Sequence, residues 1–314
     1  MTSSPDFRKG LPASTVAGGI TTGLNSHLTL NTCLQVSFKD LSLSAIAFIP
    51  TTMHKIYNFN FIIVLLSDDL MLEGISDALG NALYDYYQTG NASIVVERSD
   101  GFVEVVCDLS YYFQGYATWP ERQRLSLDYV RGRVLDIGTG SGRVAVHLQS
   151  KGFQVTAIDN SAKAVEVARL KGLNDVRLIP VEEINETLGD FDTVLMLGNN
   201  FGLMRNLSFA QNMLAKLESI VSKDGVLIIE SHDPHATDDD VHLSYHRVNI
   251  AQDKLPGELT MRIRYKKFST PWFTYLLASV NELEEILNGT SWKVLRILRD
   301  SSSRASYVGV LSRK

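Results

Sequence analysis

The sequence predicts an α/β fold built around a mostly parallel sheet. Three observations support this prediction. Short apolar segments alternate with amphipathic helical segments after about residue 126, a glycine-rich turn joins the first strand to the first helix, and two consecutive β segments close the chain. With 314 residues, 45% apolar and 21% charged, the chain has a globular composition and room for one large domain or two modest ones.

Residues 1–70 are predicted to be an N-terminal extension that is weakly ordered or of doubtful relevance. Their two apolar runs, 41–49 and 56–66, are well short of the ~20 residues that a membrane span requires. Residues 11–32 are too polar for the apolar part of a signal peptide, and an alternative hypothesis is that translation begins at Met71. The two cysteines of the chain lack zinc-site spacing, and a cytoplasmic location is expected.

Residues 71–125 are predicted to form a small cap in front of the main domain. Apolar residues recur at helical spacing from Ile75 onward, and Gly90 ends that helix. Residues 93–106 alternate in the manner of a hairpin, with Asp100-Gly101 as the turn. The cap therefore consists of one helix and one hairpin, followed by an aromatic-rich stretch.

Residues 126–314 are predicted to form the main domain. The expected strands are 133–137, 154–159, 175–180, 191–198, 225–231, 291–298 and 306–313. The expected helices are 142–152, 161–172, 208–221 and 280–289. Ser161 is placed to cap the second helix, and Ser279 forms a capping box with Glu282 at the start of the last one. Residues from about 240 to 278 contain two β-like runs around a Ser-Thr-Pro turn, which predicts an added hairpin.

The turn after the first strand reads VLDIGTGSG, residues 134–142. Its glycines allow a sharp turn and let a ligand touch the backbone. A dinucleotide fingerprint would require glycine at the position of Arg143, and Asp136 would repel a pyrophosphate. Asp159 ends the second strand, where a carboxylate can accept hydrogen bonds from ribose hydroxyls. A cationic nucleoside without phosphates, such as S-adenosylmethionine, fits both carboxylates.

VLDIGTGSG followed by VTAIDNS resembles the first two motifs of the class I S-adenosylmethionine-dependent methyltransferases. The resemblance extends over roughly residues 126–314, because FDTVLMLGNNFG, GVLIIES and the closing β pair resemble later elements of that family. It implies a Rossmann-like sheet of seven strands in the order 3-2-1-4-5-7-6, with strand 7 antiparallel. It also implies S-adenosylmethionine as the cofactor.

The resemblance assigns roles to individual residues. The glycine loop is expected to line the amino-acid part of the cofactor, Asp159 to hold the ribose, and Asn160 and Glu182 to lie beside the adenine, with Glu182 chosen over its neighbour Glu183. The predicted cofactor-binding residues are Asp136, Gly138, Thr139, Gly140, Gly142, Asp159, Asn160, Glu182 and Asn199.

The loop Gly198-Asn199-Asn200-Phe201 is expected beside the reactive methyl group. It lacks the prolines of the related enzymes that methylate amino groups of nucleic acids, and the net charge of −5 provides no general basic field. A small-molecule acceptor, methylated by in-line displacement, is therefore the leading hypothesis, without a nucleic-acid or membrane partner. The alternatives are a protein or RNA methyltransferase, a non-catalytic S-adenosylmethionine-binding protein, and a nicotinamide enzyme that the spacing of Gly142 disfavours.

Asn199, His232 and Tyr245 are the predicted catalytic residues. Candidates for a general base lie after the fifth strand, and they are Glu230, His232, Asp233, His235, His242, Tyr245 and His246. The same run has histidines at spacings that suit a metal. However, Pro234 interrupts helical geometry and methyl transfer needs no metal, so no metal site is predicted.

Two further groups have open interpretations. Arg262 and Arg264 alternate along one strand face and either bind an acidic substrate or form a solvated surface. Tyr112, Tyr116 and Trp119 either line the methyl-donor site or pack the cap.

Overall fold

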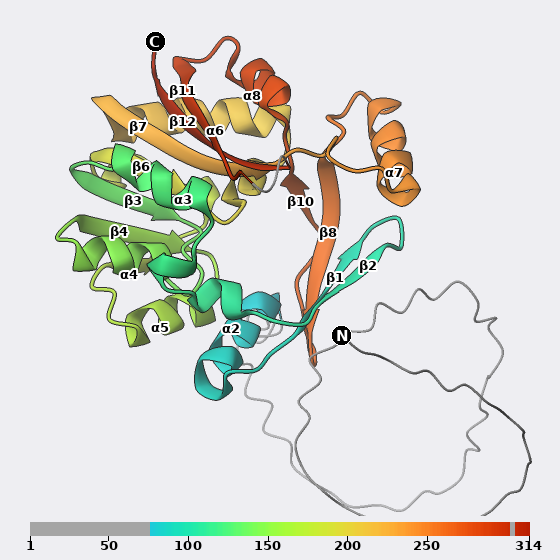
Figure 1. Cartoon of the computed structure of the whole chain (residues 1–314), viewed down its shortest axis with the longest axis horizontal. Coiled ribbons are helices and arrows are strands. Elements are labelled where there is room, and N and C mark those ends of the chain that lie inside the picture. The colour runs from blue at the N-terminus through green and yellow to red at the C-terminus, as the bar shows by residue number, and fades with distance from the viewer. Residues whose placement is uncertain (1–75, 302–304) are drawn as a thin grey trace, which may run out of the picture. The chain divides into compact units, whose positions relative to one another are not determined.

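The computed structural model describes residues 76–301 and 305–314, which form an α/β unit with two sheets (Figure 1). The predictions for residues 1–70, including a start at Met71, lie outside the described residues. The larger sheet has seven strands: β3 (Arg133–Ile137), β4 (Gln154–Asp159), β5 (Val176–Leu178), β6 (Phe191–Met196), β7 (Val221–His232), β11 (Trp292–Arg299) and β12 (Ser306–Arg313). Their order is β11-β12-β7-β6-β3-β4-β5.

This order matches the one that the sequence resemblance implies, read from the opposite edge. The strands β3 to β7 run parallel to one another, whereas β12 lies antiparallel between β7 and β11. The α/β prediction is therefore confirmed. The carboxyl ends of β3, β4 and β6 meet at one edge of the sheet, where open α/β sheets bind ligands.

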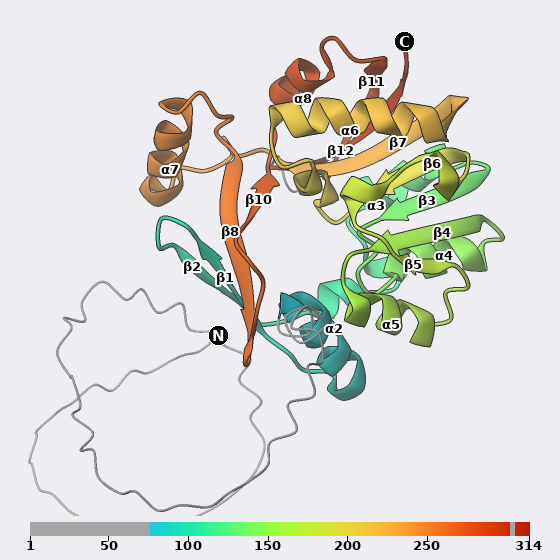
Figure 2. The ribbon, with the colours of Figure 1, turned by 180° about the vertical axis from the view of Figure 1, so that it is seen from behind.

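Helices cover both faces of the larger sheet (Figures 1 and 2). They are α3 (Glu121–Ser126), α4 (Arg143–Ser150) and α5 (Ala162–Leu170) on one face, and α6 (Leu207–Ile220) and α8 (Val280–Leu287) on the other. Because side chains of a strand alternate between faces, Val134 packs with the α4 side and Leu135 with the α6 side. The predicted caps are present: Ser161 accepts from the Ala164 amide, and Ser279 forms a capping box with Glu282.

The smaller sheet joins two segments that the sequence placed in separate hairpins. It contains β1 (Ile94–Arg98) and β2 (Val103–Val106) from the cap, and β8 (Glu258–Tyr265), β9 (Phe268–Ser269) and β10 (Phe273–Leu276) from the later segment. Strand β1 pairs antiparallel with β8, with Val96 opposite Ile263. The cap and the later hairpin are thus one structure, since pairing β1 with β8 satisfies backbone groups that each hairpin alone would leave at an open edge.

The prediction of a hairpin from about residue 240 is wrong at its start. Residues Asp240–Ile250 form helix α7. Asp239 precedes this helix, and its carboxylate accepts a hydrogen bond of 2.8 Å from the Val241 amide. Pro234 lies several residues earlier, so it does not interfere with the helix.

Helix α2 (Ala78–Thr89) anchors the smaller sheet to the larger one. Its buried side chains Ala82 and Leu83 pack with Ile94 of β1 and Tyr265 of β8. At its start, one Asp77 oxygen accepts from the Gly80 amide, and the other accepts from the Ser161 hydroxyl and the Lys163 amide at 2.9 and 3.1 Å. One carboxylate therefore caps α2 and also contacts the first turn of α5.

Strand β10 also reaches the larger sheet. The Tyr275 phenol donates a 2.6 Å hydrogen bond to the carbonyl of Asn199, at the end of β6. The ring lies so close to Gly202 that a Cβ there would overlap it. Among the described residues, no helix has both the length and the apolar character that crossing a bilayer requires.

We expect Gly202→Ala to lower the free energy of unfolding by about 1–3 kcal/mol, because the added methyl group must displace the Tyr275 ring. Gly115→Ala is the matched control, since Gly115 has φ −75° and open space around it. Urea denaturation of both variants measures the effect. Equal stability of the two variants would show that the contact between β10 and the loop after β6 is unimportant.

Candidate functional site

The loop between β3 and α4 requires glycine at three positions. Gly138, Gly140 and Gly142 have φ of 71°, 57° and 75°, in the left-handed region. A Cβ on Gly138 would lie 2.7 Å from the Asn200 side-chain nitrogen, whereas one on Gly140 would meet only the ring of Tyr112, at 3.6 Å. The loop is therefore packed at Gly138 and faces the cap at Gly140.

Asn200 ties this loop to the end of β6. Its side-chain amide donates to the carbonyl oxygens of Ile137 and Gly138, at 3.0 and 2.6 Å. The preceding residue, Asn199, has φ 64°, and its side-chain oxygen is buried without a hydrogen-bond donor. The side chain of Asn200 thus connects the loop after β6 to the glycine loop after β3.

A cavity of about 40 Å³ lies above the loop. Side chains Tyr111 and Tyr112, from the short helix Ser110–Phe113, form its outer wall. The inner wall is made by Asp136, Gly138, Thr139, Gly140, Ser141, Arg143, Val144, Leu197, Gly198 and Asn200. A ligand of nucleoside size needs several times this volume.

Two carboxylates lie beside the loop. Asp136 is 3% exposed and accepts a 2.7 Å hydrogen bond from the Thr139 hydroxyl. Asp159 accepts from the Gly140 and Ser161 amides at 2.8 and 2.9 Å. Burial raises the pKa of Asp136 and that of Asp159 to about 6, against the hydrogen bonds, which lower them. The site therefore favours the binding of a cationic group.

Glu230 of β7 is a buried acidic side chain at this edge of the sheet. It is 1% exposed and accepts hydrogen bonds from Arg122 Nε at 2.7 Å, Gln123 Nε2 at 2.6 Å and the Gly198 amide at 2.6 Å. Arg122 also contacts Asp300. Gln123 in turn donates to the Tyr111 hydroxyl at 2.7 Å, so Glu230 fixes both the loop after β6 and one wall of the cavity.

Residues 134–225 match the sequence model of a methyltransferase domain family. The fold resembles a methyltransferase from Bacteroides fragilis whose crystal structure contains S-adenosyl-L-homocysteine, with a TM-score of 0.65 and 25% identity over 77% of this chain and 96% of that one.

In sequence over residues 134–225 and in fold over 77% of the chain, the protein is thus similar to S-adenosylmethionine-dependent methyltransferases.

Curated relatives match smaller shares of the chain than the Bacteroides fragilis structure does. A glycine/sarcosine N-methyltransferase of Halorhodospira halochloris is 32% identical over 149 residues, which are 43% of this chain and 53% of the relative. A ubiquinone biosynthesis O-methyltransferase of Bordetella bronchiseptica is 43% identical over 68 residues, 20% of this chain and 28% of that protein. The first of these matches thus spans about half of the relative's length and the second less than a third.

The structure brings together many of the residues predicted to bind the cofactor. Asp136, Gly138, Thr139 and Gly140 line the cavity, and Asp159 is hydrogen-bonded to the loop. Gly142 precedes α4, and Asn199 lies next to the cavity-lining residues Gly198 and Asn200. Asn160 is exposed after β4.

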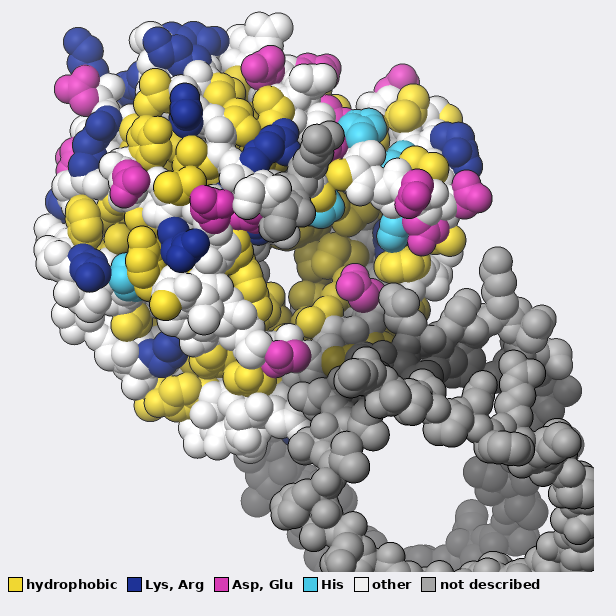
Figure 3. All heavy atoms as spheres, viewed as in Figure 1, with side chains coloured by type: hydrophobic (Ala, Val, Ile, Leu, Met, Phe, Trp, Pro, Cys, Tyr) yellow, Lys and Arg dark blue, Asp and Glu magenta, His cyan; other side chains and the backbone are white. Residues whose placement is uncertain are grey.

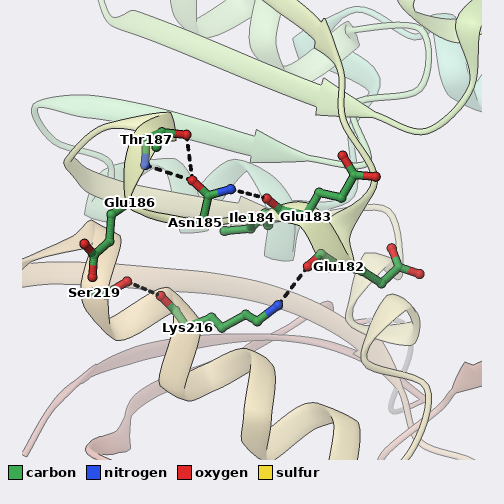
Figure 4. A pocket seen from close by; sticks show the side chains of 8 residues that line it. All are labelled: Glu182, Glu183, Ile184, Asn185, Glu186, Thr187, Lys216 and Ser219. Atoms are coloured by element: carbon green, nitrogen blue, oxygen red, sulfur yellow. Dashed lines mark hydrogen bonds between the residues drawn. The ribbon is translucent and has the colours of Figure 1, made fainter.

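Glu182 lies in a different hollow. With Glu183, Asn185, Glu186 and Lys216, it lines an open groove of about 480 Å³ (Figure 4). Its carboxylate pairs with Arg205 and its carbonyl oxygen accepts from Lys216 at 2.8 Å. No sequence pattern separates this groove from the loop cavity, and a role of Glu182 beside an adenine stays a prediction.

None of the three predicted catalytic residues lines the cavity, although Asn199 lies between the lining residues Gly198 and Asn200. The Tyr245 hydroxyl accepts a 3.0 Å hydrogen bond from the Thr260 amide, and Arg98 lies 4.3 Å from the centre of its ring. Tyr245 therefore packs α7 on β8. His232 ends β7, with Nδ1 3.1 Å from the Ser306 hydroxyl.

The histidine-rich segment gathers around α7 (Figure 3). His242 Nδ1 lies 2.9 Å from Arg98, and His235 Nε2 lies 3.1 Å from Glu282. Within residues 76–301 and 305–314, no three His, Cys, Asp or Glu side chains are arranged to hold a metal ion. His242 and His235 instead lie within hydrogen-bonding distance of neighbouring side chains.

The structure also places the two groups with open interpretations, the arginines of β8 and the aromatic residues of the cap. Arg262 and Arg264 both face Glu97 of β1, at 2.8 and 3.6 Å, which favours a solvated surface with ion pairs. Tyr112 lines the cavity, and a role for it beside the methyl donor stays a prediction. Tyr116, in contrast, stacks on His147 of α4, so it belongs to the packing of the cap.

Sequence reasoning missed Tyr111, Gln123 and Arg143. Tyr111 precedes Tyr112, for which the sequence suggests a place at the methyl-donor site. Arg143 enters the sequence argument only as the residue that departs from the dinucleotide fingerprint. No local pattern marks Gln123, because its importance arises from long-range contacts with Glu230 and Tyr111.

We expect Asp136 to make stability depend on pH. Its folded-state pKa lies above the value of 3.8 for an unfolded chain, so its stabilising contribution is complete below about pH 4 and is lost as the pH rises through about 6. Asp136→Asn, which stays neutral, should equal the wild type near pH 4 and exceed it by roughly 2–3 kcal/mol at pH 7. Urea unfolding across this range measures the difference, and parallel profiles would contradict the prediction.

Proposed function

We propose that this protein transfers the methyl group of S-adenosylmethionine to a small-molecule acceptor by in-line displacement. The observation that carries the proposal is the convergence of the glycine loop, the buried Asp136, the half-buried Asp159 and the Gly198–Asn200 loop within the segment that matches the family model. This edge of the sheet is also where open α/β folds bind ligands.

The residues present fit S-adenosylmethionine. Asp136 offers a buried anion to the ammonium group of the cofactor's amino-acid part. Asp159 retains acceptor capacity beyond its two backbone hydrogen bonds and can accept from ribose hydroxyls. A dinucleotide is disfavoured for two reasons: position 143 is arginine where the fingerprint requires glycine, and Asp136 would repel a pyrophosphate.

When bound, S-adenosylmethionine supplies a methyl group on a positively charged sulfur, and the neutral thioether that remains after transfer is a good leaving group. The chain then has to align the acceptor, and alignment can supply about 7–11 kcal/mol of the barrier. Glu230 fixes the Gly198 amide and Tyr275 fixes the Asn199 carbonyl, which keeps this loop rigid. We assign these two residues a positioning role and propose that Asn199 contacts the reacting groups.

An acceptor that must lose a proton needs a base, and His232 remains our candidate. Burial lowers the pKa of His232, so the imidazole is neutral at pH 7 and able to accept a proton. Tyr245 is a weaker candidate, because its hydroxyl is occupied by the Thr260 amide.

The acceptor class rests on the curated relatives. One is a glycine/sarcosine N-methyltransferase and another a ubiquinone biosynthesis O-methyltransferase, and both names indicate small acceptors. We therefore propose a small amine or hydroxyl compound. Methyl transfer to protein or RNA is the alternative, and the net charge of −5 disfavours RNA.

We expect S-adenosylhomocysteine to raise the melting temperature, whereas NAD leaves it unchanged. Asp159→Ala should weaken S-adenosylhomocysteine binding at least tenfold, because the hydroxyls lose a charged acceptor. The exposed Asp128 provides a control, since Asp128→Ala should bind normally. Thermal shift and titration calorimetry measure these effects; stabilisation by NAD alone would refute the proposal.

The acceptor can be found by incubating the protein with methyl-labelled S-adenosylmethionine and fractionated cell extract. We expect label in the small-molecule fraction, and mass spectrometry of the product identifies the methylated atom. Label confined to protein or RNA would contradict a small-molecule acceptor while leaving the cofactor assignment intact.

A further inference from the structure

The smaller sheet has one charged face and one apolar face. Glu97 of β1 lies opposite Arg262 of β8 and forms an ion pair with it at 2.8 Å. Because side chains of a strand alternate between faces, the residues next to these two belong to the other face. The register places five apolar or aromatic residues on that other face, namely Val96, Met261, Ile263, Phe273 and Tyr275. An antiparallel sheet of this kind has one face in water and one face to cover.

The apolar face is covered only at its borders. At one border, Tyr265 of β8 packs with helix α2, and at another the Tyr275 ring lies against Gly202. Between them, the register partners Met261 and Phe273 are half-buried and belong to none of the buried apolar clusters formed by the described residues. Figure 3 shows apolar side chains gathered beside a hollow between the smaller sheet and the larger one.

The uncovered residues form what we call the apolar strip, defined as Val96, Met261, Ile263 and Phe273. Val96 and Ile263 pack against the same buried cluster as Tyr112, which lines the loop cavity. The strip therefore adjoins the wall of the candidate site.

The other end of the strip reaches the loop after β6. Tyr275 follows Phe273 by two residues on the same face, a rise of about 7 Å. Its hydroxyl donates to the Asn199 carbonyl at 2.6 Å, and the side-chain oxygen of Asn199 is buried without a donor. A ligand lying on the strip thus has an unpaired hydrogen-bond acceptor near one end.

The charges around the strip do not suit a zwitterion. Arg98, the register partner of Met261, already forms an ion pair with Asp100 at 2.7 Å. Glu104, the register partner of Val96, is exposed on β2 at the far side of the sheet from β10. A carboxylate on the strip would lose water without gaining an ionic contact, whereas an apolar group gains free energy from the area it buries.

We propose that the apolar strip binds the body of the methyl acceptor, which is an apolar amine or hydroxyl compound with its N–H or O–H group toward Asn199. This inference rests on the proposed function and narrows its acceptor class. It sets the acceptor apart from a free amino acid, for which the strip offers no ionic partner.

The test measures binding of phenol, 4-ethylphenol and 4-butylphenol to the full chain saturated with S-adenosylhomocysteine. We expect the affinity to rise about three- to fourfold for each added methylene, the gain for burying one such group. Titration calorimetry measures the affinities, after the same method has established that S-adenosylhomocysteine binds.

Two variants with the same new residue locate the effect. Met261→Gln keeps the length of the side chain but makes it polar, so it should lower the affinity for 4-butylphenol at least fivefold and leave that for S-adenosylhomocysteine unchanged. Val105→Gln is the matched control, because Val105 is exposed on β2 and lies opposite Val95, on the charged face. Val96→Thr, which keeps the shape of the side chain, carries the test if Met261→Gln does not fold.

Two results would overturn the inference: an affinity that does not rise with alkyl length in the wild type, or a rise that persists unchanged in Met261→Gln. Occupation of the strip by a second copy or by another segment of the chain would give the first result. A labelled amino acid as the product formed from cell extract would also overturn it, since we expect a product that partitions into an organic solvent. Failure to bind S-adenosylhomocysteine would instead refute the proposed function, so the two failures are distinguishable.

Discussion

The buried carboxylate of Glu230 is the interaction on which the site depends. Its two oxygens accept hydrogen bonds from α3 and from the loop after β6, which lie far apart in the sequence. Arg122 extends the connection to Asp300, beyond the end of β11. A buried carboxylate is costly unless its acceptor positions are filled. The requirement to fill those of Glu230 therefore fixes the position of the cap relative to the sheet.

The same network connects the loops of the site to the cap. The glycine loop and the Gly198–Asn200 loop are joined by Asn200 and supported by Tyr275 from the smaller sheet. Tyr111 and Tyr112 line the cavity from the short 3₁₀-helix Ser110–Phe113. The Tyr111 hydroxyl accepts hydrogen bonds from Gln123 and Arg143, and Gln123 also donates to Glu230, so this wall of the cavity is tied to the buried carboxylate.

Local signals in the sequence predicted the elements of the main sheet, because each element carries its own evidence. Asp100-Gly101 marked a turn, Ser161 and Ser279 marked helix starts, and the spacing after Val134 marked the glycine loop. The pairing of β1 with β8 involves residues over 160 positions apart, such as Val96 and Ile263, and no local pattern encodes it. The residue type of Tyr245 favours a catalytic role, whereas the hydrogen bond between its hydroxyl and the Thr260 amide depends on the fold and has no sequence signal.

Charge balance connects the open cavity to the stability of the cap. Asp136 and Arg143 are both buried at the cavity wall, and among the described residues neither has a partner of opposite charge in direct contact. A ligand that compensates both charges lowers the free energy of the folded state, as any ligand specific to that state does. Arg143 also bonds to Tyr111 and Gln123, so compensation at Arg143 acts on the same groups that Glu230 holds. Occupancy of the cavity and order in the cap are therefore coupled through one set of hydrogen bonds.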